Sequence, residues 1–264
     1  MQRLKLAVSL DSLGLPLRRG LQEIERMGVT GVQIDAAGDL SPRTLSQTGR
    51  REFLHLLRAY NLELAALACP LRHGLDVAEG QEARIDYVKR VLSLSFDLGA
   101  RRATIQAGRV PEEVDSPGAR LMTEALLTLG QHGDRTGSML AIETGPESGL
   151  SLRQFLDRFD TGGLGVNLDP ANLLLANFPL PESVRALQGK VVFGQARDAR
   201  RAGTSPAAQE VPLGHGDIDW LEYLALLEEI EYRGWLSVRR DSGANRRADV
   251  AAGVQFLRRF VGPD

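Results

Sequence analysis

Two apolar runs that each end in a carboxylic acid constrain the fold of this chain most strongly. The run Leu140–Ile142 is followed directly by Glu143, and the run Leu164–Leu168 is followed directly by Asp169. Short apolar runs bounded by turn residues are typical of buried strands. The sequence therefore predicts two neighbouring strands that each deliver an acid at the carboxyl end.

The residues between these two runs predict one helix. We expect Ser151 to be its N-cap, with Gln154 three residues further on completing a capping pair. Strands joined by a helix run parallel, so their carboxyl ends meet at the same edge of the sheet. Enzymes with parallel sheets place their active sites at this edge, so the two acids are candidate functional groups.

Apolar runs followed by helical patterns recur along the chain. Eight such runs start roughly 25 to 45 residues apart, which is the rhythm of strand–helix units. They are Leu4–Leu10, Gly31–Ile34, Leu62–Ala68, Ala103–Ile105, Leu140–Ile142, Leu164–Leu168, Lys190–Phe193 and Trp235–Val238. Eight units predict an α/β fold, a single (β/α)8 TIM barrel that spans residues 1–264 as one domain. The alternative is a doubly wound sheet, which the lack of a GxGxxG motif disfavours as a dinucleotide binder.

Charge and composition exclude several classes of protein. The 264 residues carry a formal net charge of -2 with a sequence pI of about 6.1, unlike the basic surface of a nucleic-acid binder. No apolar run reaches the roughly 18 residues of a membrane span, and no signal peptide is recognisable. The one cysteine, Cys69, excludes a disulfide within the chain. We expect a cytoplasmic protein with no nucleic-acid partner and no membrane partner.

Polar side chains follow every predicted strand. A lone acid there usually caps a turn or a helix, and this is the interpretation we favour for Asp11, Asp35, Asp198 and Asp241. We favour a functional role for Glu143 and Asp169, because they end adjacent buried strands and precede Gly or Pro turns. The other strand ends carry Arg72, His73, Gln106, Asn172, Gln195, Arg197 and Arg239.

Five stretches carry a resemblance to a known group of barrels: LAIETG, GVNLDPANLLL, VVFGQARDAR, VPLGHGDIDWLEYLALLEEIEYRGWLSVRRDSG and VAAGVQFLRRF. They resemble the xylose isomerase-like TIM-barrel superfamily, the sugar (phosphate) isomerase and epimerase group. The resemblance covers nearly the whole chain and is most specific from Leu140 onward. It implies a divalent metal, often manganese, magnesium or zinc, held by a Glu, an Asp, a His and a second Glu at successive strand ends. The two Glu residues of the family's epimerases also move protons to and from the sugar carbon.

Two of these four ligands are replaced in this chain. Glu143 and Asp169 match the first Glu and the Asp by position, whereas Gln195 stands in place of the His and Arg239 in place of the second Glu. The frequent His three residues after the Asp is here Asn172. Arginine stays protonated and has no lone pair to offer a metal, so the resemblance implies a degenerate metal site. We expect no metal at the family's affinity, and Mn, Mg or Zn on Glu143 and Asp169 only if one is retained.

A guanidinium group at this place allows two interpretations. In the first, Arg239 fills the site as an ion pair with Glu143 and Asp169. In the second, Arg239 polarises a substrate carbonyl or binds an anion. Both interpretations place the three side chains together at the carboxyl-end mouth of one barrel.

Further candidates lie outside the matched ligand positions. Residues 197–218 lack periodicity, and we expect them to form an irregular, mobile cover over the mouth. Within them, Arg197 and Arg200 are candidates for binding a phosphate or carboxylate. His215 is a candidate acid–base group at neutral pH, and His73 is a candidate for substrate binding. An ordinary surface loop or turn is the alternative for each of them.

The hypothesis that we favour is an isomerase or epimerase acting on a sugar, sugar phosphate or related polyol. Glu143 would act as the base, Arg239 with Gln195 would stabilise the oxyanion, and the expected partner is a small carbohydrate-like molecule. Asp169, Asn172 and Gln106 would contact the substrate. The alternative is a non-catalytic barrel that binds a sugar-like ligand or serves as a partner subunit after losing the metal. An endonuclease-like relative is disfavoured by four scattered histidines, and a homo-oligomer remains open.

Overall fold

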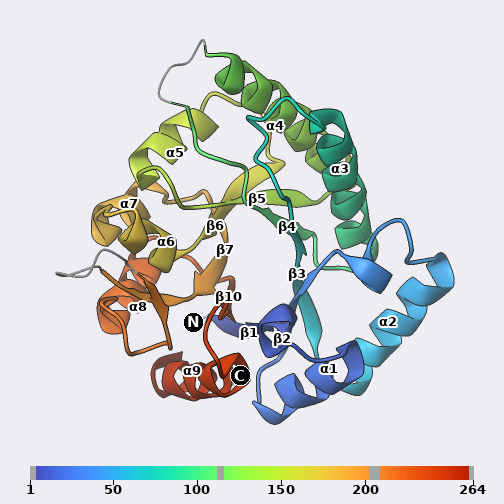
Figure 1. Ribbon diagram of the computed structural model, residues 1–264, viewed down its shortest axis with the longest axis vertical. Coiled ribbons are helices and arrows are strands. Elements are labelled where there is room, and N and C mark those ends of the chain that lie inside the picture. The colour runs from blue at the N-terminus through green and yellow to red at the C-terminus, as the bar shows by residue number, and fades with distance from the viewer. Residues whose placement is uncertain (1–3, 112–115, 202–208, 262–264) are drawn as a thin grey trace.

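Eight parallel strands close into a barrel in the computed structural model, within the residues it describes, which are 4–111, 116–201 and 209–261 (Figure 1). Around the barrel the order is β1, β2, β3, β4, β5, β6, β7 and β10, and β10 pairs with β1 to close the ring. The bounds are β1 Lys5–Ser9, β2 Gly31–Asp35, β3 Glu63–Cys69, β4 Arg102–Ile105, β5 Met139–Glu143, β6 Leu164–Leu168, β7 Val191–Ala196 and β10 Trp235–Val238. The predicted (β/α)8 barrel is confirmed, and each predicted apolar run overlaps one of these strands.

Helices surround the barrel on its outside (Figure 1). They are α1 Leu17–Arg26, α2 Gln47–Ala59, α3 Gln81–Asp97, α4 Pro117–Thr136, α5 Gly149–Leu156, α6 Pro170–Leu175, α7 Leu180–Ala186, α8 Trp220–Glu229 and α9 Arg246–Val261, with short 3-10 turns η1 Leu10–Leu13 and η2 Gly38–Leu40. The helices turn apolar stripes toward the strands, as α1 does with the fully buried Leu21 and Ile24. Among the described helices, none is both long and apolar enough to cross a membrane.

The start of α5 differs from the prediction. Ser148, and not Ser151, is the N-cap, and its hydroxyl oxygen accepts a hydrogen bond from the Ser151 backbone N–H. Gly149, the first residue of the helix, lies directly against α7, where a Cβ atom would stand 2.3 Å from the Ser183 carbonyl oxygen. Asp219 is the N-cap of α8, and its carboxylate accepts hydrogen bonds from the Leu221 and Glu222 N–H groups.

The stretch after β7 contains regular structure that the sequence did not predict. The strands β8 Asp198–Arg200 and β9 Gln209–Val211 pair antiparallel, and residues 202–208 between them lie outside the described residues. The buried Asp198 carboxylate organises the returning chain by accepting hydrogen bonds from the N–H groups of Gly214 and Gly216 and from the Trp220 indole. The expectation of an irregular stretch is therefore wrong for both of its described ends.

The barrel interior changes from apolar to polar toward the carboxyl ends of the strands. A lower layer packs small side chains against two aromatic ones, and it consists of Ala7, Ala65, Ala66, Ala141, Phe193 and Trp235. Side chains alternate along a strand, so the next inward position lies two residues further on. Those positions are polar and buried on several strands, with Gln33, Asn167, Gln195 and Ser237 each at most 2% exposed. This polar layer forms the floor beneath the candidate site.

Candidate active site

Glu143, at the end of β5, is the centre of a hydrogen-bond cluster at the mouth of the barrel. Its Oε1 accepts hydrogen bonds from Gln106 Nε2 at 2.8 Å and Asn172 Nδ2 at 3.0 Å. Its Oε2 accepts them from Asn167 Nδ2 at 3.0 Å and Arg239 Nη1 at 3.1 Å. A carboxylate has about four lone-pair sites, so these four donors fill the acceptor capacity of Glu143.

Asp169 pairs with a different arginine from the one the sequence suggested. Its Oδ2 accepts a hydrogen bond from Arg197 Nη1 at 2.8 Å, and its Oδ1 caps α6 by accepting the Asn172 N–H at 3.1 Å. No ion pair joins Asp169 to Arg239 among the described residues. Arg239 therefore pairs with Glu143, as expected. The pairing of Arg239 with Asp169, which was also expected, is wrong.

Arg197 is buried within the cluster rather than presented on a surface loop. Its side chain is 8% exposed and forms ion pairs with Asp169, Glu210 and Asp241. Glu210, on β9, also accepts hydrogen bonds from the backbone N–H groups of Asp241 and Ser242. Glu210 thereby links the β8–β9 pair to the end of β10, and Arg197 lies in the buried cluster and not on an exposed loop.

Burial and charge set the protonation of this cluster. Burial raises the pKa of Glu143 above its ordinary value, the Asp169 charge acts in the same direction, and the Arg239 charge opposes both. All four neighbours of the Glu143 oxygens are hydrogen-bond donors, which is the environment of an ionised carboxylate. We therefore treat Glu143 as a carboxylate at neutral pH, held in place by the guanidinium group of Arg239.

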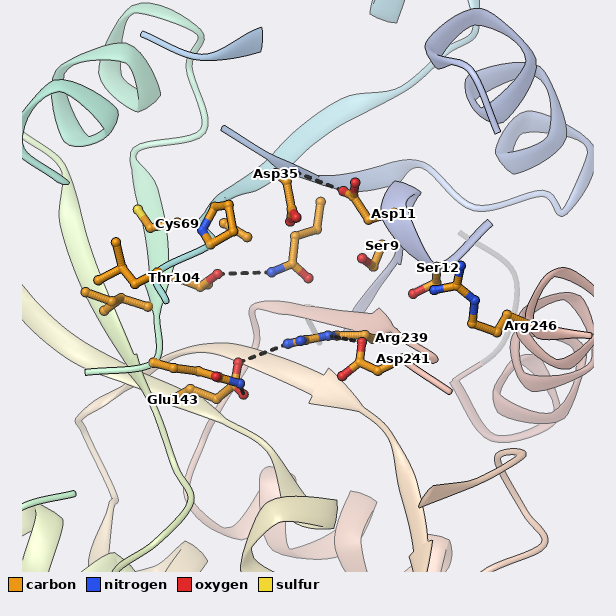
Figure 2. Close-up of a pocket in the computed structure, with 16 residues that line it drawn as sticks. Ser9, Asp11, Ser12, Asp35, Cys69, Thr104, Glu143, Arg239, Asp241 and Arg246 are labelled. Carbon is orange, nitrogen blue, oxygen red and sulfur yellow. Dashed lines mark hydrogen bonds and ion pairs between the residues drawn. The ribbon is translucent and has the colours of Figure 1, made fainter. Parts of the chain in front are cut away.

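A cavity of about 290 Å³ opens beside Arg239 (Figure 2). The floor includes Ser9, Gln33 and Thr104, and the walls include Asp11, Asp35, Cys69, Gln106, Glu143, Arg239, Asp241 and Arg246. A second hollow, on the other side of Glu143, shares Gln106 and Glu143 with the first and adds Thr144 and Asn172. The Glu143 cluster therefore stands between two spaces large enough for small polar molecules.

The sequence interpretation missed the importance of Asp35. Its side chain lines the cavity, and its backbone N–H donates a hydrogen bond to Asp11 Oδ2 at 3.1 Å (Figure 2). Burial and the adjacent Asp11 charge raise the pKa of Asp35 to about 6. Gln33 and Thr104 were also missed, although both occupy inward positions that strand alternation indicates. Gln33 Nε2 donates to Thr104 Oγ1, and Gln195 Nε2 donates to Gln33 Oε1, each at 3.1 Å.

Three predicted site residues lie away from this cavity. His73 and His215 are exposed and line neither of the two spaces beside Glu143. Arg200 is exposed as well, and its Nη2 donates a hydrogen bond to the His215 carbonyl oxygen at 2.6 Å. The structure brings Gln106, Asn172, Asp169, Arg197 and Arg239 together around Glu143, with Gln195 in the layer below, and leaves these three outside.

The donor set at the mouth does not fit a divalent metal ion. In the part of the chain that the structure describes, no three acids, histidines or cysteines gather as a metal site. The two acids that match family ligands, Glu143 and Asp169, are occupied by N–H donors and paired with arginines. Gln195 is fully buried and its Oε1 has no hydrogen-bond partner, but this single neutral oxygen is a weak ligand beside two cations.

Known proteins that resemble this chain share its barrel. A family model described as "Xylose isomerase-like TIM barrel" matches residues 21–260. A xylose isomerase domain protein from Planctomyces limnophilus is 25% identical, covers 98% of this chain and 97% of its own length, and superposes with a TM-score of 0.84. A D-tagatose 3-epimerase-like protein is 19% identical over 97% of this chain and 96% of its own, with a TM-score of 0.79.

A third structure carries a different printed activity on the same fold. The "probable 3-DHS dehydratase" of Bacillus anthracis is 16% identical, covers 96% of this chain and 98% of its own, and has a TM-score of 0.77. At this identity the likeness concerns the fold alone. Among curated proteins, none matches the chain significantly.

Proposed function

Because the chain belongs to the xylose isomerase-like TIM-barrel family, we propose that it is a sugar or sugar-phosphate isomerase or epimerase whose metal site is degenerate. The observation that supports this proposal is the Glu143–Arg239 ion pair beside a polar cavity at the barrel mouth. A permanent cation there can stabilise the negative charge that develops on a carbonyl oxygen during proton transfer.

The arginines argue against metal binding at the family's affinity. A unit charge about 4 Å from the ion position opposes a cation by about 4 kcal/mol per elementary charge at an effective dielectric near 20. A tenfold change in affinity corresponds to about 1.4 kcal/mol, so a cation at this distance lowers the metal affinity of the site by orders of magnitude. Arg197 adds a second cation on Asp169. We therefore derive no catalytic step through a metal.

Each side chain has a defined chemical part in this proposal. Arg239 lines the cavity and presents donors to a substrate oxygen, while Glu143 and Asp241 hold its guanidinium group in place. Glu143 itself is a poor base in this arrangement, because its acceptor sites are filled. Gln106 and Thr104 supply polar contacts for hydroxyl groups of the ligand.

Exchange of substrate hydrogen with solvent tests the proposal directly. We expect the wild-type protein, in deuterated buffer with a chelator, to incorporate deuterium into D-tagatose or another ketose next to the carbonyl group, as measured by NMR. Arg239→Met should reduce the rate by at least tenfold. Arg185→Met, which removes the exposed Arg185–Glu229 ion pair, should leave the rate unchanged. Exchange that requires added Mn²⁺ would contradict the metal-free part of the proposal.

A non-catalytic barrel is the second candidate function. The observation that favours it is the completeness of the cluster, in which the acids and arginines satisfy one another without a ligand. In that case sugars would raise the melting temperature of the protein without any exchange. We also propose that residues 1–264 act as one cytoplasmic domain, and size-exclusion chromatography with light scattering would establish whether it assembles with itself.

A further inference from the structure

Two acids that line the cavity, Asp35 and Asp11, receive no hydrogen bond from a donor side chain among the described residues, and Asp11 accepts the Asp35 backbone N–H instead. Asp35 ends β2, and Figure 2 shows its carboxylate directed toward the space between Arg239 and Thr104. Glu143, in contrast, accepts four hydrogen bonds. A group that takes a proton needs a free lone pair, and Asp35 has one facing the cavity.

The floor of the cavity beside Asp35 presents two hydroxyl groups, those of Ser9 and Thr104. Ser9 is only 6% exposed and lines the cavity, yet its hydroxyl forms no hydrogen bond with any residue that the structure describes. The Thr104 hydroxyl accepts from Gln33 and has its own proton free to donate. Both hydroxyls therefore keep hydrogen-bonding capacity that they can offer to a polar ligand in the cavity.

The surroundings of Asp35 hold its proton affinity near neutrality. Burial is the largest cause of the raised pKa of about 6, the Asp11 carboxylate is the second, and the Arg239 charge acts in the opposite direction. The titratable and charged groups that face Asp35 from neighbouring elements are Asp11, Cys69, Tyr87, Arg239 and Asp241. The Cys69 thiol and the Tyr87 phenol have raised pKa values because of burial and stay neutral.

We propose that Asp35 is the proton-transfer group of this barrel and that Asp11 tunes it, with a polyhydroxylated ketone as the substrate. This inference rests on the proposed isomerase function. The Asp35 carboxylate removes the proton from a carbon next to the carbonyl group, and the C–H electron pair forms a carbon–carbon double bond. The carbonyl electron pair moves onto its oxygen, where Arg239 stabilises the negative charge. Return of the proton from Asp35 to carbon reverses these electron movements.

Two measurements on the same variants test this proposal. In ¹³C-aspartate NMR titrations, we expect one carboxyl of the wild type to titrate near 6, to be absent in Asp35→Asn and to move to lower pH in Asp11→Asn. In deuterium exchange with D-tagatose, Asp35→Asn should lose at least 100-fold, the usual range of general acid–base catalysis. Asp11→Asn should move the pH profile of exchange to lower pH. Asp39→Asn, at an exposed acid beside β2, is the matched control and should change neither measurement.

The outcomes separate this proposal from the proposed function. Wild-type exchange in a folded Asp35→Asn variant, or an Asp35 carboxyl that titrates near 4, would overturn the assignment of Asp35. If Asp35→Asn fails to fold, the Asp11→Asn pH profile decides the assignment, since an unshifted profile would also overturn it. The proposed function and the catalytic step would be overturned together by a wild type that exchanges no hydrogen in D-tagatose, in the other ketoses tested, or in 3-DHS, the compound named in the description of the third similar structure. The titration would then still decide whether Asp11 tunes Asp35.

Discussion

Replacement of Arg197 by methionine should destabilise the fold strongly, because it removes the partner of a fully buried acid. Asp169 is 0% exposed, and its Oδ2 has the Arg197 guanidinium as its hydrogen-bond partner at 2.8 Å. The Arg197 guanidinium also forms an ion pair with Glu210, whose side chain is 7% exposed. Methionine keeps much of the length and apolar stem of arginine but supplies no charge and no donor.

The size of the effect follows from the burial of both partners. Breaking a buried ion pair by removing one member costs about 3 to 5 kcal/mol, since the remaining charge stays in a poor solvent without compensation. For a chain of this size, each kcal/mol lowers the melting temperature by roughly 2 to 4 °C. We therefore expect Arg197→Met to melt roughly 6 to 20 °C below the wild type and to unfold at a lower urea concentration.

A matched pair of variants separates charge from packing. Asp169→Asn added to Arg197→Met should recover part of the lost stability, because it removes the unpaired charge. Arg185→Met serves as the surface control. Arg185 forms two hydrogen bonds to Glu229 at 2.7 and 3.1 Å, but both side chains are about half exposed, so the expected loss is less than about 1 kcal/mol. Equal losses in Arg197→Met and Arg185→Met would refute the reasoning.

Three further predictions concern the metal, pH and the helix cap. Arg239→Glu combined with Gln195→His should raise Mn²⁺ affinity at least tenfold in calorimetric titration, and stoichiometric metal on the wild type would contradict this. The raised pKa of Asp35, about 6, favours its neutral form in the folded state, so its contribution to stability is complete below pH 4 and lost as the pH rises through 6. Asp35→Asn should therefore gain stability relative to the wild type between pH 4 and 6 in urea titrations. Ser148→Ala should cost about 1 kcal/mol of unfolding free energy, and Ser151→Ala clearly less.

The strands could be predicted because apolar runs and their spacing are local properties of the sequence. The pair of Glu143 and Arg239 could also be predicted, since each follows directly from the position where an apolar run ends. Arg197 was accessible to the same reasoning. It stands two residues after Gln195, so the alternation of β7 directs both side chains into the barrel. Assigning Arg197 to a loop concealed that signal.

Asp35 could not be identified from the sequence, because its environment depends on contacts across the fold. A lone acid at a strand end is usually a cap, and Asp11 is indeed bonded to a backbone N–H there. What distinguishes Asp35 is the cavity beside it, whose walls come from strands as distant in the sequence as β4 and β10. The β8–β9 pair was missed because strands of three residues show no measurable alternation.

The positive charge of the two arginines stays in the cluster under conditions in which a bound metal ion would be lost. The carboxylates of Glu143 and Asp169 are matched by the guanidinium groups of Arg239 and Arg197. A guanidinium group stays protonated and is covalently part of the chain, so neither a chelator nor moderate acidity removes it. The charge that would stabilise an enediolate oxygen is thus permanent and fixed by the fold. In the reaction that we propose, the further requirement is a base with a free lone pair, and Asp35 lines the same cavity as Arg239.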